Sequence, residues 1–191
     1  PEGKVDLLLD EWGTWFDVEP GTNPGHLFQQ NTMRDAMVAS LSLNIFHKYT
    51  ERLKMANIAQ IANVLQSMVL TKGDKMVLTP TYHTFRMYNV HQDATYLPVT
   101  CDSEKFTDSN NRQCPYVDAT ASRNAEGKIH ITLTNTSLKE DAEVTIDLGL
   151  DGKTAITGEI LTSADIHDCN TFENPETVRP VAFVNYKIKN G

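Results

Sequence analysis

The chain is 191 residues long, with 40% hydrophobic and 22% charged side chains and a formal net charge of −8. This composition is ordinary for a globular protein of one large or two small domains. The acidic charge argues against nucleic acid or an anionic membrane surface as a partner, and no apolar run approaches the roughly 20 residues that span a bilayer.

The first segment, residues 5–9, is an almost continuous apolar run that ends at Asp10 and Glu11. Such a run predicts a strand buried on both faces of a parallel sheet. Carboxylates are costly inside a buried strand, but at its C-terminal end they can face a cleft, where α/β folds place their chemistry. The neighbouring Trp12 and Trp15 offer aromatic faces on which sugar rings pack. We therefore expect a carbohydrate site here; the simpler alternative is an Asp-Glu pair that only caps the strand.

Two helices are predicted downstream of this strand. Thr32 followed by Asp35 has the spacing of a capping box, and small and apolar residues then recur at helical intervals. Thr79 before Pro80 predicts the start of a second helix, which we expect to run to about Asp93. The histidines on these helices lie away from the expected strand ends and are interpreted as structural or solvated: His47, His83 and His91.

Between the helices, periodicity leaves residues 55–65 open to either a strand or more helix, and residues 72–75 indicate a turn. Two motifs in this half of the chain, Asp-Glu-Trp-Gly-Thr-Trp at residues 10–15 and Ala-Gln-Ile-Ala-Asn-Val at residues 59–64, resemble the C-terminal part of the α-L-arabinofuranosidases of glycoside hydrolase family 51. The resemblance is dense to about residue 98 and looser beyond it.

The resemblance implies a fold and a set of site residues. Residues 1–95 would be the last two βα units of a (β/α)₈ (TIM) barrel, with residues 55–65 running through barrel strand eight into its loop. Glu11 would be the catalytic nucleophile at the end of strand seven. Gln60 would hydrogen-bond a sugar hydroxyl, which an amide can read as donor or acceptor. Trp15 would lie along the sugar subsite.

From residue 96 the pattern changes to strands without helical periodicity. Residues 128–134 and 143–148 alternate apolar and polar side chains and predict a hairpin through residues 135–141. Further strands are expected at residues 117–122, 156–161 and 182–188, with turns at Glu126-Gly127 and Asp151-Gly152 and a long irregular loop over residues 102–113. One buried and one wet face per strand predict an antiparallel β-sandwich domain over residues 96–191.

The proposed chemistry needs more than this chain contains. Retaining glycosidases use two carboxylates about 5–5.5 Å apart. Asp10 is adjacent to Glu11, but successive strand residues point to opposite faces, so we do not expect it to be the partner. The family resemblance implies an acid/base Glu that follows Asn, and the chain has no Asn-Glu dipeptide. We therefore expect a fragment that lacks the N-terminal part of the barrel, is inactive alone and associates with itself.

The remaining side chains suggest no cofactor. The three cysteines, Cys101, Cys114 and Cys169, show no zinc-binding spacing and are interpreted as isolated thiols, although Cys101 and Cys114 could close a loop. No His/Asp/Glu spacing favours a metal. We expect no cofactor, no metal, no nucleic acid and no membrane partner.

The favoured hypothesis is therefore the C-terminal portion of a retaining, exo-acting α-L-arabinofuranosidase that acts on arabinose-containing oligo- or polysaccharides. A related retaining glycosidase, such as an endoglucanase or β-xylosidase, is the nearest alternative. A non-catalytic carbohydrate-binding or stability module is the alternative from another class.

Overall fold

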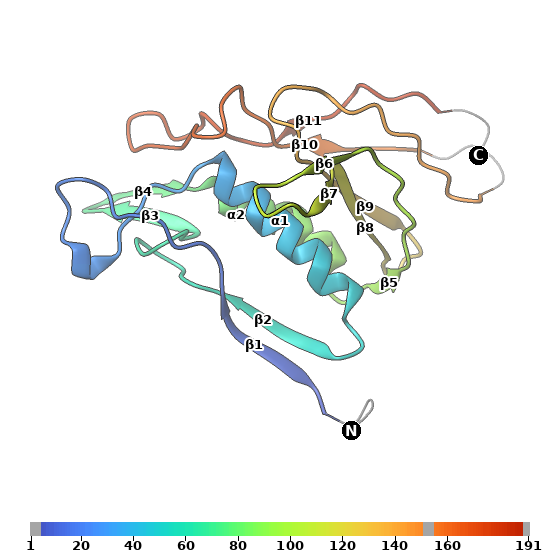
Figure 1. Ribbon diagram of the computed structural model, residues 1–191, viewed down its shortest axis with the longest axis horizontal. Helices are drawn as coiled ribbons and strands as arrows, with labels where there is room; N and C mark the ends of the chain where they lie inside the picture. The colour runs from blue at the N-terminus through green and yellow to red at the C-terminus, as the bar shows by residue number, and fades with distance from the viewer. Residues whose placement is uncertain (1–4, 151–154, 189–191) are drawn as a thin grey trace.

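The structure is a computed structural model that describes residues 5–150 and 155–188 (Figure 1). It is a mixed α/β fold in which one parallel strand pair and two helices are followed by small antiparallel sheets. The first half contains β1 (Leu7–Trp12), η1 (Pro24–His26), α1 (Met33–Lys48), β2 (Leu53–Ile58), β3 (Val69–Lys72), β4 (Lys75–Leu78), α2 (Pro80–Tyr88) and η2 (Asn89–His91). The second half contains β5 (Thr95–Leu97), β6 (Lys105–Thr107), β7 (Gln113–Pro115), β8 (Val117–Arg123), β9 (Ile129–Asn135), β10 (Glu159–Ile160) and β11 (Val181–Ala182).

The predicted parallel strands are present. β1 pairs with β2 in parallel, and the helix α1 connects them as a crossover. Leu7 and Leu8 are each more than half exposed, and Met55 is 41% exposed. The reason is that, in the described part of the chain, β1 and β2 have no other strand beside them. The burial on both faces predicted for residues 5–9 is therefore wrong for this structure, in which none of these residues is buried.

Helix α1 begins where the capping pattern predicted. The carboxylate of Asp35 accepts a hydrogen bond from the backbone N–H of Thr32 at 2.9 Å. Two further N–H groups at this helix end donate to a distant segment, Met33 to the carbonyl of Asp168 and Arg34 to that of Ile166, both at 2.9 Å. These bonds satisfy donors that a helix start leaves unpaired, and they tie the C-terminal part of the chain to the helix.

Helix α2 also begins as predicted, with the Thr79 hydroxyl accepting from the backbone N–H of Tyr82 at 3.3 Å and Pro80 in the first turn. It ends at Tyr88, earlier than the predicted Asp93, and continues as the 3₁₀ turn η2. The early end turns His91 toward the strands β8 and β9, where its ring nitrogens contact two hydroxyls.

Residues 59–65, which follow β2, form a loop and do not continue the strand. β2 ends at Ile58, the Ala59–Gln60 peptide bond is cis, and Asn63 and Leu65 have positive φ values of 59° and 53°. The turn predicted at residues 72–75 is confirmed, with Gly73 at φ 61°, but the strands β3 and β4 that flank it were not predicted.

In the second half, β8 and β9 confirm two of the predicted strands. They pair in antiparallel register from Val117 opposite Asn135 to Arg123 opposite Ile129, around the predicted Glu126-Gly127 turn. β5 adds to the other edge of β8. The loop predicted over residues 102–113 is partly wrong, because β6 lies within it and pairs as a short hairpin with β7, which begins at Gln113.

The predicted strand at residues 143–148 is wrong, and with it the hairpin through residues 135–141. Residues 141–150 form no strand, and Val144 and Ile146 remain 40% and 46% exposed. Alternation specifies a strand only where a sheet edge and a core face are available to it, and the described residues bring neither to this segment. The strands expected at residues 156–161 and 182–188 shrink to the two-residue pair β10–β11. The predicted Asp151-Gly152 turn lies outside the described residues.

The helices form the middle of the molecule. α1 packs against α2, and its two sides carry β1–β2 and β8–β9 (Figure 1). Lys48 pairs with Asp118 at 2.9 Å, and the amide of Asn44 donates to the same carboxylate at 3.0 Å, which fixes α1 on β8. Among the helices of the described residues, none has the length and apolar character to cross a membrane.

Candidate active site

The predicted site residues lie at the C-terminal end of the parallel strand pair. Trp12, the last residue of β1, lies opposite Ile58, the last residue of β2. The backbone N–H of Ala59 then donates to the carbonyl of Trp12 at 3.0 Å, which prolongs the pairing. Glu11 therefore sits at the C-terminal end of β1, and Gln60 follows the C-terminal end of its neighbour. Both side chains are exposed.

A β-bulge interrupts β1 at the carboxylates. Leu9 lies opposite Ala56 and Trp12 opposite Ile58, so three steps on β1 match two on β2. The extra residue reverses the alternation, and Trp12 shares the helix-facing side with Leu9, which lines a groove beside Phe46. The regular alternation used to exclude Asp10 as the partner of Glu11 is thus wrong at this point. Asp10 and Glu11 both lie inside the bulge and are exposed.

The two tryptophans have different surroundings. The Trp12 ring meets Phe46 edge to face at 5.1 Å and stacks on Phe85 at 5.9 Å, so it packs on the helices. Trp15 is 70% exposed. Of the two aromatic faces expected beside Glu11, the structure leaves only Trp15 open to a ligand.

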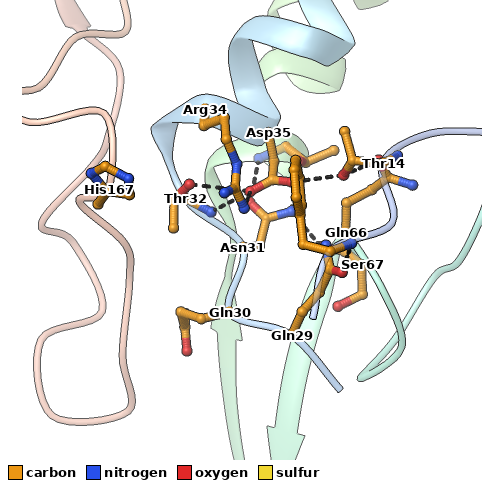
Figure 2. A network of polar contacts seen from close by, with 12 residues as sticks. Thr14, Gln29, Gln30, Asn31, Thr32, Arg34, Asp35, Gln66, Ser67 and His167 are labelled. Carbon is orange, nitrogen blue, oxygen red and sulfur yellow. Dashed lines mark hydrogen bonds and ion pairs between the residues drawn. The ribbon is translucent and has the colours of Figure 1, made fainter. Parts of the chain in front are cut away.

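A buried polar network supports this edge (Figure 2). Gln66 belongs to the loop after β2, is 2% exposed, and extends its side chain to the loop after β1. Its Oε1 accepts from the backbone N–H of Thr14 and, at 2.7 Å, from the Thr14 hydroxyl. Its Nε2 donates to the carbonyl of Ala59 at 2.6 Å. The Thr14 hydroxyl also lies 2.8 Å from Oδ1 of Asp35, at the start of α1.

The next residues of the first loop are anchored in the same way. The backbone N–H of Phe16 donates to Oε1 of Gln29 at 2.9 Å. The Arg34 guanidinium lies 3.4 Å from the centre of the Phe16 ring and 3.5 Å from the Asp35 carboxylate. A cation over an aromatic face is attractive. The two residues next to Trp15, Thr14 and Phe16, are therefore both held in place by hydrogen bonds.

A second cluster of titratable groups lies between the helices and β8–β9. His91 is bonded through its two ring nitrogens to Ser122 at 2.7 Å and Thr132 at 2.8 Å. Burial, followed by the nearby His47 and His130, lowers the pKa of His91 to about 4. Burial also lowers the pKa of His47 and raises that of Tyr88 to about 12. These groups stay uncharged near neutral pH and hold helix to sheet, as expected for structural histidines.

The thiols and possible metal ligands do not form a site in the part of the chain described. Cys101, Cys114 and Cys169 are free thiols, so the loop closure left open for Cys101 and Cys114 is not formed. Burial raises the pKa of the Cys169 thiol, with smaller contributions from Asp168 and Glu19. No three His, Cys, Asp or Glu side chains of the described residues gather as metal ligands.

The supporting network was not predicted from the sequence. Gln66 lies in a loop, and nothing in its neighbourhood marks it as buried. Asp35 was predicted only as a helix cap, but it also reaches Thr14. Gly13 was the one available signal, since a glycine inside an aromatic motif often marks a close approach. With φ at 147°, it lies where any Cβ would overlap the Gln66 amide.

Comparison with known proteins adds to this geometry. The family described as the α-L-arabinofuranosidase C-terminal domain matches residues 10–191. An intracellular exo-α-L-arabinofuranosidase of Bacteroides ovatus is 60% identical over 188 residues, which are 98% of this chain and 37% of that protein. The chain thus spans little more than a third of this curated relative.

Solved structures agree with this match. The GH51 arabinofuranosidase of Xanthomonas axonopodis pv. citri superposes with a TM-score of 0.93 at 47% identity, over 98% of this chain and 38% of that one. The α-L-arabinofuranosidase of Thermotoga maritima in an arabinose complex gives a TM-score of 0.78 at 25% identity, over 95% of this chain and 39% of that one.

Proposed function

The chain belongs to the C-terminal domain family of GH51 α-L-arabinofuranosidases, and on that premise we propose that it carries the nucleophile half of a retaining, exo-acting active site. The parent enzyme would release terminal α-L-arabinofuranosyl residues from plant polysaccharides or oligosaccharides. The observation that carries the proposal is the placement of Glu11, Trp15 and Gln60 at one edge of the strand pair, at or just beyond the strand ends.

Each of the three residues has a role that its chemistry allows. Glu11 attacks the anomeric carbon and forms a covalent arabinosyl intermediate, which water then hydrolyses. Trp15 offers an exposed ring to the apolar face of the sugar. Gln60 holds a hydroxyl of the arabinose. The second carboxylate, which protonates the leaving oxygen and later activates water, comes from the part of the parent outside these 191 residues.

The domain boundaries belong to the same proposal. Residues 1–95 are the last two βα units of a (β/α)₈ barrel, which agrees with the order β1, α1, β2, α2 and with the parallel pairing. Residues 96–191 are a β-sandwich domain that packs on the helices. The exposure of Leu7 and Leu8 supports the proposal that a further barrel strand of the parent lies beside β1.

The sugar specificity is tested with the full-length parent on a panel of nitrophenyl glycosides. We expect turnover of the α-L-arabinofuranoside to exceed that of the β-xyloside and β-glucoside. In the same enzyme, Glu11→Ala removes turnover, and azide partly restores it by entering the space of the missing carboxylate. A preference for the xyloside or glucoside would favour one of the related retaining glycosidases instead.

A further inference from the structure

We propose that Gln66 is a positioning residue of this site. It joins the loop after β1 to the loop after β2 and thereby sets the distance and orientation between Trp15 and Gln60. This inference rests on the proposed function, because it needs Trp15 and Gln60 to contact the sugar. Gln66 itself does not meet the substrate, since it is 2% exposed and its bonds all lead to protein groups.

The oxygen and the nitrogen of the Gln66 amide each bond the residue that precedes one of the two proposed sugar-binding residues. Oε1 accepts from the backbone and hydroxyl of Thr14, which precedes Trp15. Nε2 donates at 2.6 Å to the carbonyl of Ala59, which precedes Gln60. The single Gln66 amide thus holds the backbone immediately before Trp15 and immediately before Gln60.

The amide has little freedom to move. Gly13 leaves the space that the amide fills, and a Cβ there would overlap it. The backbone beside Gln66 is held as well, because the N–H of Leu65 donates to the carbonyl of Leu27 at 3.0 Å. On the far side, the Thr14 hydroxyl also lies 2.8 Å from Oδ1 of Asp35, at the start of α1, so its single hydrogen has an acceptor on either side. The arrangement is a rigid support rather than a loop contact that adapts.

The kinetic consequence follows from geometry. Misplacement of binding groups by about 1 Å can cost on the order of 100-fold in rate. Without the Gln66 amide, Trp15 and Gln60 are no longer fixed relative to each other, so their contributions to transition-state binding fall together. The effect of removing Gln66 must therefore depend on whether Gln60 is present.

The test is a double-mutant cycle in the full-length parent with an aryl α-L-arabinofuranoside. Gln66→Met keeps the length and approximate volume of the side chain and removes all its hydrogen bonds. We expect it to lower kcat/KM by about 10- to 100-fold. In a Gln60→Ala background the same substitution has a clearly smaller effect, because the contribution it would disturb is already lost. Equal factors in both backgrounds, or an unchanged kcat/KM, would overturn the proposal.

A matched control separates positioning from loss of stability. Asn44 is another buried amide, 0% exposed, and it bonds Tyr88 and Asp118 at the opposite end of α1. Asn44→Leu should lower the melting temperature while leaving kcat/KM within about twofold of wild type, since additive, distant sites do not couple. A comparable kinetic loss in Asn44→Leu would assign the Gln66 effect to general destabilisation.

Gln66→Glu provides a second variant if Gln66→Met does not fold. The ionised carboxylate that this substitution introduces cannot donate to the Ala59 carbonyl, whereas the protonated carboxyl can donate there and still accept from Thr14. The ratio of variant to wild-type kcat/KM should therefore rise as the pH is lowered, and a flat ratio contradicts the proposal. Glu11→Ala keeps the two claims apart: full turnover in that variant refutes the proposed function, whatever the Gln66 cycle shows.

Discussion

At the scale of single residues, Glu11 and Gln60 have different tasks in the proposed reaction although both lie at the same edge of the strand pair. Glu11 forms and breaks a covalent bond, so nothing else in the chain replaces it. Gln60 contributes one hydrogen bond to an uncharged hydroxyl, and such a bond contributes about 0.5–1.5 kcal/mol, or more when its partner is left buried and unpaired.

Gln60→Ala in the full-length parent is therefore expected to lower kcat/KM by roughly 2- to 13-fold, the equivalent of that energy. Glu11→Ala should remove turnover almost completely. Steady-state kinetics on one aryl arabinofuranoside measures both. Equal losses in the two variants would mean that Gln60 supports the nucleophile directly rather than binding the sugar.

At the scale of elements, the loop after β1 depends on a glycine. Gly13 has φ 147°, where other residues are strained, and a side chain there displaces the Gln66 amide. Gly13→Ala in the full-length parent is expected to lower both the melting temperature and kcat/KM. Gly73→Ala is a suitable control, because Gly73 also has a positive φ, 61°, but meets no neighbouring atom within 4 Å. A kinetic loss of the same size in both variants would show that backbone strain alone is responsible.

The contact between α2–η2 and the β8–β9 sheet should make stability depend on pH. The pKa of His91 is about 4 in the folded chain, below its ordinary 6.5, because burial disfavours the charged ring. Between pH 6.5 and about 4 the unfolded chain therefore binds more protons, and stability falls as the pH falls through this window. A lowered pKa of His47 acts in the same direction.

This dependence is measured as the free energy of unfolding of the chain from pH 8 to pH 4. One group contributes at most about 1.4 kcal/mol per pH unit. His91→Gln, which stays uncharged and can still bond hydroxyls, should have a flatter profile in that window. An unchanged slope in the variant would exclude His91 as a source of the pH dependence.

Elements with strong local signals could be predicted from the sequence, and those that depend on a partner could not. The capping residues Thr32 and Thr79 fix both helix starts through contacts within one turn. Residues 143–148 alternate as a strand does, yet they need an edge to pair with, and the sequence does not say whether one is there. The bulge at Asp10 and Glu11 leaves no pattern of its own, because both residues would fit a regular strand end.

The same reasoning applies to the site. Glu11, Trp15 and Gln60 could be named because short motifs carry them, whereas Gln66 could not, since its role depends on two loops that are distant in sequence. The proximity of Thr14 and Gln66, 52 residues apart, follows from the parallel pairing of β1 and β2.

At the scale of the whole molecule, apolar surface lies open beside the parallel strand pair. A groove of about 380 Å³ runs beside β1 and is lined by Leu7, Leu9, Phe46, Tyr49, Arg52 and Leu53. Leu7, Leu8 and Met55 are exposed at the same strand pair. An exposed apolar surface of this kind usually marks a contact with other protein. In the proposed parent, the remaining barrel strands cover it.

The isolated 191-residue chain is accordingly expected to hydrolyse no arabinofuranoside and to self-associate. In the proposed reaction, the acid/base and the opposite wall of the subsite come from the part of the parent outside these 191 residues, and protonation of the leaving group contributes about 10²–10⁴-fold. The test is an activity assay of the purified chain together with light scattering of its mass in solution. A monodisperse monomer with enzyme-like turnover would refute this view of the chain.

The most direct test of the proposed nucleophile is to trap the covalent intermediate. The full-length parent is incubated with a fluorinated α-L-arabinofuranosyl substrate whose intermediate hydrolyses slowly, and the labelled peptide is identified by mass spectrometry. We predict a single arabinosyl label on Glu11. A label on any other residue, Asp10 included, would contradict the assignment of the nucleophile to this strand end.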